Sequence, residues 1–236
     1  MKQRFIGSML LACALSILPG LSSAGVTLES TRVVFPPGGK EASILVKNRA
    51  SEDVMIQSWV ESESDPKAAV PFAITPSLSR LGPAKQQVLR IFYQGRGLPS
   101  DRESVFWLNV QEIPQKAKSD NTLQIAVRQR VKVFYRPAGL PGNADEAASN
   151  LVWRIVEADG KPFLEVRNDA RFNVSFGAVK LLSGRSEQRV PVEMAAPGGT
   201  QRVELAGKGA TPTRVEYETV NDYGAIVAHA SDVSPS

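Results

Sequence analysis

The sequence contains almost no cysteine and almost no histidine. Among its 236 residues there is one of each, Cys13 and His229. Cys13 lies in an N-terminal apolar run that we expect to be removed, so the mature chain would have no cysteine for a disulfide, a thiol nucleophile or a metal site. No zinc motif or nucleophile elbow surrounds His229, which favours a structural role. The sequence therefore predicts a protein that is not an enzyme and has no metal and no cofactor.

No apolar run reaches the roughly 20 residues that a membrane-spanning helix needs. The longest candidate, residues 5–18, follows the basic residues Lys2 and Arg4 and ends at the helix breaker Pro19. This order is typical of a secretory signal peptide and disfavours an uncleaved anchor. We therefore assign residues 1–24 to a signal peptide and expect no membrane insertion after its cleavage.

The sequence also lacks a strong excess of either charge. With 28 basic and 24 acidic residues the formal net charge is +4, and loss of Lys2 and Arg4 with the signal peptide lowers it to +2. The basic residues are scattered along the chain, which argues against a nucleic-acid-binding protein.

Short, valine-rich runs between prolines and glycines fill most of the mature chain. Their spacing is typical of strands in an all-β protein built from sandwiches. The first half has such runs at residues 26–35, 43–47, 54–60, 88–93, 105–113 and 123–135. The second half has them at residues 151–157, 163–167, 174–182, 202–205, 213–220 and 226–230.

A proline- and glycine-rich stretch at residues 137–142 separates these two sets, and the small polar residues 143–150 after it are typical of a linker. We therefore predict an N-terminal domain at residues 25–142 and a C-terminal domain at residues 143–236. Each is long enough to bury a core of its own.

Residues 123–135 form the most regular of these segments. Alternation with period two places one set of side chains on a single face: Leu123, Ile125, Val127, Gln129, Val131, Val133 and Tyr135. The segment is about twice the usual strand length. It is either a long core strand of an isolated sandwich or a strand that extends past its sheet and leaves an apolar edge for another chain.

Three segments resemble the periplasmic pilus (fimbrial) chaperones of the PapD-like chaperone/usher family. Residues 101–114 read Asp-Arg-Glu-Ser-Val-Phe-Trp-Leu-Asn-Val-Gln-Glu-Ile-Pro and resemble the signature of that family. Residues 122–137 resemble its long seventh strand, and Asn-Asp-Tyr-Gly at residues 221–224 matches a turn in its second domain. The similarity covers nearly all of the mature chain.

The resemblance implies both a fold and a function. The fold would be two immunoglobulin-like β-sandwich domains in an L-shaped arrangement with an interdomain cleft. The function would be that of a periplasmic chaperone, which binds, stabilises and caps pilus subunits by donor-strand complementation and delivers them to an outer-membrane usher. Pilins and the usher are thus the expected partners, and self-association of the free protein stays open.

The resemblance also implies three groups of functional residues. Those similar to the apolar positions lent to a pilin are Leu123, Ile125 and Val127. Those similar to the basic pair that holds the C-terminal carboxylate of a pilin are Arg32 and Lys132. Those that match an interdomain salt-bridge network are Glu103, Arg136 and Asp222.

The chain departs from its relatives in three ways. Some relatives have a disulfide in the second domain, which this chain cannot form. The tail after Tyr223 is short, so the last strand of that domain is expected to be abbreviated or missing. The segment between Pro114 and Leu123 is also short, which resembles the subclass that serves rod-like pili.

Two other functional classes remain open from the residues alone. Glu61 and Glu63 share a strand face, but a glycosidase would need a pocket around them. A secreted immunoglobulin-like carbohydrate-binding module would use Trp59, Trp107 and Trp153 as stacking platforms, although core packing is the more common role of tryptophan in such domains.

The first testable prediction concerns processing. Ser22 and Ala24 are small residues at the positions that a signal peptidase recognises, so the mature protein should begin at Gly25. Mass measurement of the intact secreted protein checks this. A mature N-terminus at a lipidated Cys13 would contradict it, because the protein would then be tethered to a membrane.

Overall fold

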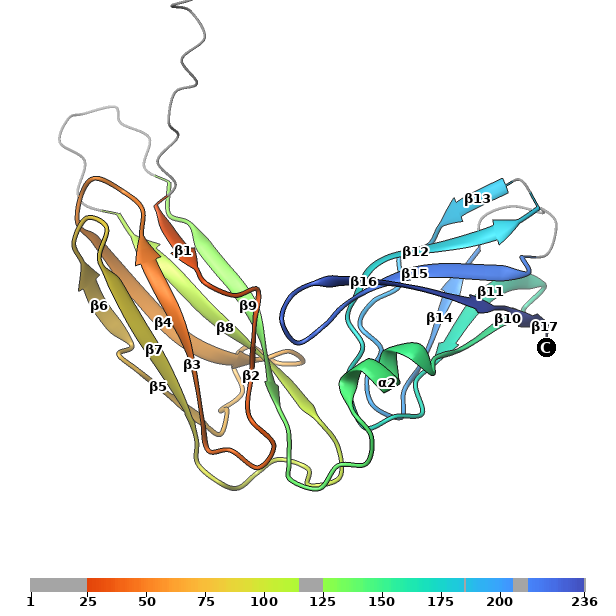
Figure 1. Ribbon diagram of the computed structural model, residues 1–236, viewed down its shortest axis with the longest axis horizontal. Coiled ribbons are helices and arrows are strands. Elements are labelled where there is room, and N and C mark those ends of the chain that lie inside the picture. The colour runs from red at the N-terminus through yellow and green to blue at the C-terminus, as the bar shows by residue number, and fades with distance from the viewer. Residues whose placement is uncertain (1–24, 115–124, 185, 206–211, 236) are drawn as a thin grey trace, which may run out of the picture.

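Strands dominate the computed structural model, which describes residues 25–114, 125–184, 186–205 and 212–235. Two separate hydrophobic cores lie in the two arms of an L (Figure 1). The predicted all-β fold with two sandwiches in an L-shaped arrangement is confirmed. No helix among these residues is long and apolar enough to cross a membrane.

Two sheets form the first sandwich. One has the strand order β1 (Val26–Leu28), β3 (Glu41–Asn48), β7 (Gln86–Tyr93) and β5 (Phe72–Thr75). The other has the order β2 (Arg32–Val34), β9 (Arg128–Tyr135), β8 (Ser104–Ile113), β4 (Val54–Ser62) and β6 (Leu78–Leu81). Alternate apolar side chains fill the space between the sheets, and Phe35, Leu89, Leu108 and Val133 have no exposed surface.

The single strand predicted at residues 26–35 is two strands in opposite sheets. β1 pairs antiparallel with β3, whereas β2 pairs parallel with β9. Ser30 lies at the bend between them, where its hydroxyl donates to the carbonyl of Arg32 at 2.6 Å and closes a local turn. The bend carries Arg32 out of the first sheet and places it beside β9.

The second sandwich has its own pair of sheets. One has the order β14 (Thr200–Glu204), β11 (Lys161–Arg167), β10 (Val152–Ala158) and β17 (Ser234–Pro235). The other has the order β13 (Ser186–Arg189), β12 (Phe176–Ser183), β15 (Arg214–Val220) and β16 (Ile226–Asp232). The core centres on Trp153, which is 1% exposed and whose ring centre lies 5.1 Å from that of Tyr217.

One prediction for the second half of the chain is wrong, and another is confirmed. The segment taken as a linker contains helix α2 (Ala144–Ser149), capped by the Asn143 side chain, which accepts from the backbone N–H of Glu146 at 2.8 Å. Ala147 and Ala148 of this helix are buried in the second core, but one and a half turns are too few to show helical periodicity. The last strand of the domain is abbreviated as expected, because β17 spans two residues, whereas β16 before it pairs with β15 along its whole length.

Candidate functional site

Arg32 and Lys132 lie at paired positions of neighbouring strands. In the parallel register of β2 and β9, Arg32 is the direct partner of Lys132. Side chains at paired positions project from the same face of a sheet. The fold therefore brings together two cations that are 100 positions apart in the sequence, on the side of the first domain that faces the second.

The guanidinium of Arg32 reaches the second domain. Its Nη1 donates to the carbonyl oxygen of Val220 at 2.6 Å, and the group lies 5.6 Å from the ring centre of Phe134. Its Nε is buried and has no hydrogen-bond partner in the described part of the chain. Burial lowers the pKa of Arg32, although the charges of Asp222 and Glu103 act in the opposite direction.

The ammonium of Lys132 also reaches the second domain. Its Nζ lies 3.4 Å from Ser175 Oγ and 3.3 Å from Met194 Sδ. Burial lowers the pKa of Lys132, and the neighbouring charge of Arg32 lowers it further against the opposing effect of Glu63. Within the described ranges, no carboxylate forms an ion pair with Lys132 or Arg32. Two partly desolvated cations without a counter-ion form a site suited to a carboxylate.

Arg136, at the end of β9, bridges the two domains. Its Nε donates to Glu103 Oε1 at 2.6 Å, and its Nη1 and Nη2 donate to the two carboxylate oxygens of Asp222 at 2.5 and 2.7 Å. Burial by itself lowers the pKa of Arg136, but the hydrogen bonds and charges of the two carboxylates outweigh it, so the pKa is raised. The fork geometry of the guanidinium fixes Asp222, and with it the end of β15, relative to the first domain.

Glu103 has no exposed side-chain surface and is fully paired. Its Oε2 accepts from both the backbone N–H and the side-chain amide of Asn173, each at 2.8 Å. Burial nevertheless raises the pKa of Glu103, against the charge of Arg136 and the two hydrogen bonds from Asn173. Nothing in the sequence marks Asn173, Ser175 or Val220 as part of this site, because only the packing of the second domain brings them to it.

Strand β9 has an open edge just before Lys132. β2 pairs only with Lys132 to Phe134, and no described strand pairs with residues 128–131 on the side away from β8. Ile125 and Val127 precede the strand with 72% and 46% of their surface exposed. Leu123 lies outside the described residues. An open edge next to exposed apolar side chains is the arrangement that accepts a strand from another chain.

The predicted strand at 123–135 is therefore shorter than expected, since β9 begins at Arg128. Its alternation is confirmed where the opposite sheet covers it, because Val131, Val133 and Tyr135 are all buried. The same alternation leaves Ile125 and Val127 exposed, since the described residues of the domain provide no core for them.

The three tryptophans and Glu61, which the alternative functions would use, have partners within the protein. Trp153 is buried in the second core. Arg130 lies 4.5 Å from the ring centre of Trp107 and forms an ion pair with Glu61 at 2.6 Å. Glu61 also accepts from the indole N–H of Trp59 at 3.1 Å. No group of three metal-ligating side chains gathers among the residues described.

Two family models together match most of the chain. Residues 25–141 match "Pili and flagellar-assembly chaperone, PapD N-terminal domain", and residues 146–231 match "Pili assembly chaperone PapD, C-terminal domain".

Individual relatives are similar over nearly their whole length. The "Probable fimbrial chaperone LpfB" of Escherichia coli O157:H7 is 39% identical over 95% of this chain and 94% of its own. "Chaperone protein FimC" of E. coli K12 is 34% identical over 92% of this chain and 88% of its own.

Solved structures share the fold, including its immunoglobulin-like domains. The crystal structure of the YadV chaperone has a TM-score of 0.77 and 31% identity, and it covers 89% of this chain and all of that one. The SafB chaperone of Salmonella enterica, solved in complex with the SafA pilin, has a TM-score of 0.75 and 25% identity over 88% of this chain and 96% of its own.

The bridge through Arg136 generates a prediction about stability. Arg136→Ala leaves the carboxylate of Glu103 buried without its cation, which should lower the free energy of unfolding by about 3–5 kcal/mol at neutral pH. Because burial raises the pKa of Glu103 in the folded state, this loss should shrink as the pH falls through that pKa and the carboxyl becomes neutral. Urea denaturation at several pH values measures both effects.

Arg90→Ala is the matched control for this experiment. Arg90 forms a bidentate ion pair with Glu41 in the same domain, but both side chains are exposed. The control should lose far less stability than Arg136→Ala. Equal losses in the two variants would contradict the interdomain bridge as a main source of stability.

Proposed function

The chain belongs to the PapD-like family of pilus-assembly chaperones, and on that premise we propose that it captures pilus subunits by lending them strand β9 and by holding their C-terminal carboxylate between Arg32 and Lys132. A pilin resembles an immunoglobulin domain that lacks its last strand, so its core is open and its sheet edge is unpaired. A donated strand fills the open core and pairs with the sheet edge until the subunit is assembled.

One observation carries the proposal, namely that two cations without a counter-ion lie at the end of an open strand edge with exposed apolar side chains before it. The two cations can bind a carboxylate, and the open edge can form a ladder of backbone hydrogen bonds with another strand. Ile125 and Val127 can pack into an apolar groove. SafB, a relative with the same fold, has been solved with a pilin bound.

The position of the anchor determines the direction of the captured strand. A carboxylate held at Lys132 marks the C-terminal end of the incoming segment. The rest of that segment must run back along the open edge towards Val127 and Ile125, so it pairs parallel to β9. A slip of one residue would turn its apolar side chains to the wrong face. The cations therefore select the register, and the apolar side chains contribute most of the affinity.

The remaining parts of the proposal concern compartment and delivery. We assign the protein to the periplasm after removal of residues 1–24, and we assign delivery of the bound pilin to an outer-membrane usher. The boundary between the domains stays at residues 142 and 143 as a prediction, although Leu140 packs partly against the second core. An exposed donor edge in the free protein keeps self-association open.

Replacement of Ile125 by aspartate tests the donor segment. The side chain is exposed in the free protein, so Ile125→Asp should leave the urea unfolding curve unchanged. In the complex, the new carboxylate would be buried in an apolar groove without a partner, which is strongly unfavourable. Most of the pilin should therefore be lost when the tagged variant is purified from the periplasm.

Leu78→Asp is the control, because Leu78 is 54% exposed on the far edge strand β6. Its recovery of pilin should match the unsubstituted protein. A destabilised Ile125→Asp variant would mean that this residue belongs to the core of the chaperone.

Replacement of Lys132 by alanine tests the anchor and the function together. The unsubstituted, tagged protein should co-purify with a pilin that mass spectrometry identifies. The two cations would hold the C-terminal carboxylate of the pilin while the donor edge pairs with its last segment. Lys132→Ala should recover little or none of it while keeping its thermal midpoint, since Lys132 has no ion-pair partner to lose among the described residues.

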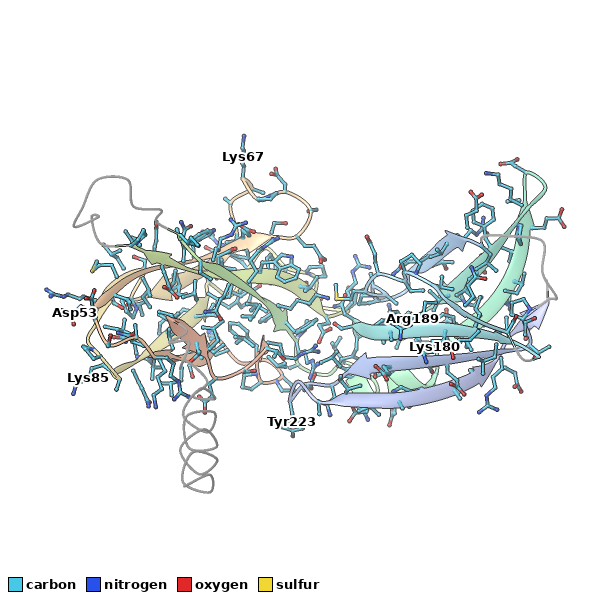
Figure 2. All side chains as sticks on the ribbon, turned by 90° about the horizontal axis from the view of Figure 1, so that it is seen from above. Asp53, Lys67, Lys85, Lys180, Arg189 and Tyr223 are labelled. Carbon is cyan, nitrogen blue, oxygen red and sulfur yellow. The ribbon has the colours of Figure 1, made fainter. Side chains whose placement is uncertain are left out.

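Lys67→Ala is the matched control. Lys67 lies on a loop of the same domain and points away from the molecule (Figure 2). Undiminished pilin recovery with Lys132→Ala would refute the anchor, and the absence of any pilin with the unsubstituted protein would refute the function.

A further inference from the structure

Arg32 and Lys132 each contact a residue of the second domain, and these two residues are hydrogen-bonded to each other. Lys132 Nζ lies 3.4 Å from Ser175 Oγ, and Arg32 Nη1 donates to the Val220 carbonyl at 2.6 Å. The backbone N–H of Val220 in turn donates to the carbonyl of Ser175 at 2.9 Å. Since Arg32 and Lys132 are paired across β2 and β9, the four residues form a closed ring that spans both domains.

From this ring we propose that Ser175 is a positioning residue for pilin capture, which holds the ammonium of Lys132 where it can bind the C-terminal carboxylate. The inference rests on the proposed function and deepens it, because it gives the second domain a direct part in the anchor.

The chemistry at Lys132 assigns this role to Ser175. An ammonium has three hydrogens to donate and accepts none, so it is held in place by acceptors. Among the described residues its hydrogen-bond acceptors are the Ser175 hydroxyl and the thioether of Met194, which is a weak acceptor, and the ring centre of Trp107 lies 5.8 Å away. Without Ser175 the long, flexible side chain would sample many conformers, and a ligand would have to order it on binding.

Ser175 itself is firmly placed. It is 6% exposed, and the residue before it, Val174, exchanges two backbone hydrogen bonds with Ala195, each at 2.9 Å. Its own carbonyl accepts from Val220, near the end of β15. Asp222, two residues beyond Val220, is bound by Arg136. The interdomain ion bridge therefore also fixes the position of Ser175.

The turn after Asp222 adds a contact with the first domain. Gly224 has a φ of +83°, and a Cβ at this position would lie 2.6 Å from the hydroxyl oxygen of Thr31, the residue before Arg32. Only glycine allows the turn to lie this close. Figure 1 shows the turn before β16 reaching towards β2. The second domain thus meets the first at Val220, at Asp222 and at Gly224.

The experiment uses the pilin that co-purifies with the protein. Its C-terminal strand is synthesised as a peptide with either a free carboxylate or a C-terminal amide, and both affinities are measured by calorimetry. The unsubstituted protein should prefer the carboxylate form. Ser175→Ala should weaken binding of that form roughly tenfold, as expected for one hydrogen bond to a charged group, and should leave binding of the amide unchanged.

Three further variants make the result specific. Ser175→Thr keeps the hydroxyl and should restore the preference for the carboxylate. Ser175→Cys keeps the size but has a weak acceptor, so it should behave as the alanine variant does, and it replaces that variant if alanine fails to fold. Ser186→Ala removes an exposed hydroxyl of the same domain and should have no effect.

The inference is overturned if Ser175→Ala keeps the full affinity for the carboxylate, or if it weakens the carboxylate and amide forms equally, as a general structural defect would. These outcomes differ from a failure of the proposed function. In that case the unsubstituted protein would itself bind the two forms equally well or would bind neither.

Discussion

The structure depends on one mostly buried guanidinium, that of Arg136. It binds Glu103, whose side chain has no exposed surface, and holds both oxygens of Asp222 in the other domain. A lysine in its place would present a single point charge and could not hold both carboxylates in fixed directions. The geometry of the fork therefore sets how the second domain lies against the first, and with it the positions of Val220 and Ser175.

The anchor beside this bridge has the opposite electrostatic character. Arg136 has two carboxylates, whereas Arg32 and Lys132 have none among the described residues and receive only neutral acceptors from the second domain. Burial lowers the pKa of both, and the neighbouring charge of Arg32 lowers the pKa of Lys132 further. Under the proposed function, this arrangement lowers the stability of the free protein and becomes favourable when the carboxylate of a pilin binds.

Much of the fold could be predicted from the sequence, because burial of one sheet face imposes a period of two. The runs that became β3, β4, β7, β8 and β15 each show it, and their bounds moved by one or two residues. The short strands β5, β6, β13 and β17 span two to four residues, which is too few to show a period. The bend at Ser30 was missed for a different reason, since it depends on which sheet each half of the segment joins.

The sequence by itself determined which residues could do chemistry. The composition offered a single thiol, that of Cys13, the alternation of residues 123–135 marked an apolar face, and the motifs around Glu103, Lys132 and Asp222 carried the resemblance to chaperones. The resemblance already implied that Arg32 and Lys132 act as a pair, but only the tertiary structure decided that they lie in register on β2 and β9 and that Ser175 and Val220 hold them. The physical reason is that local patterns record burial along one strand, whereas contacts between strands and domains depend on where distant segments of the chain meet.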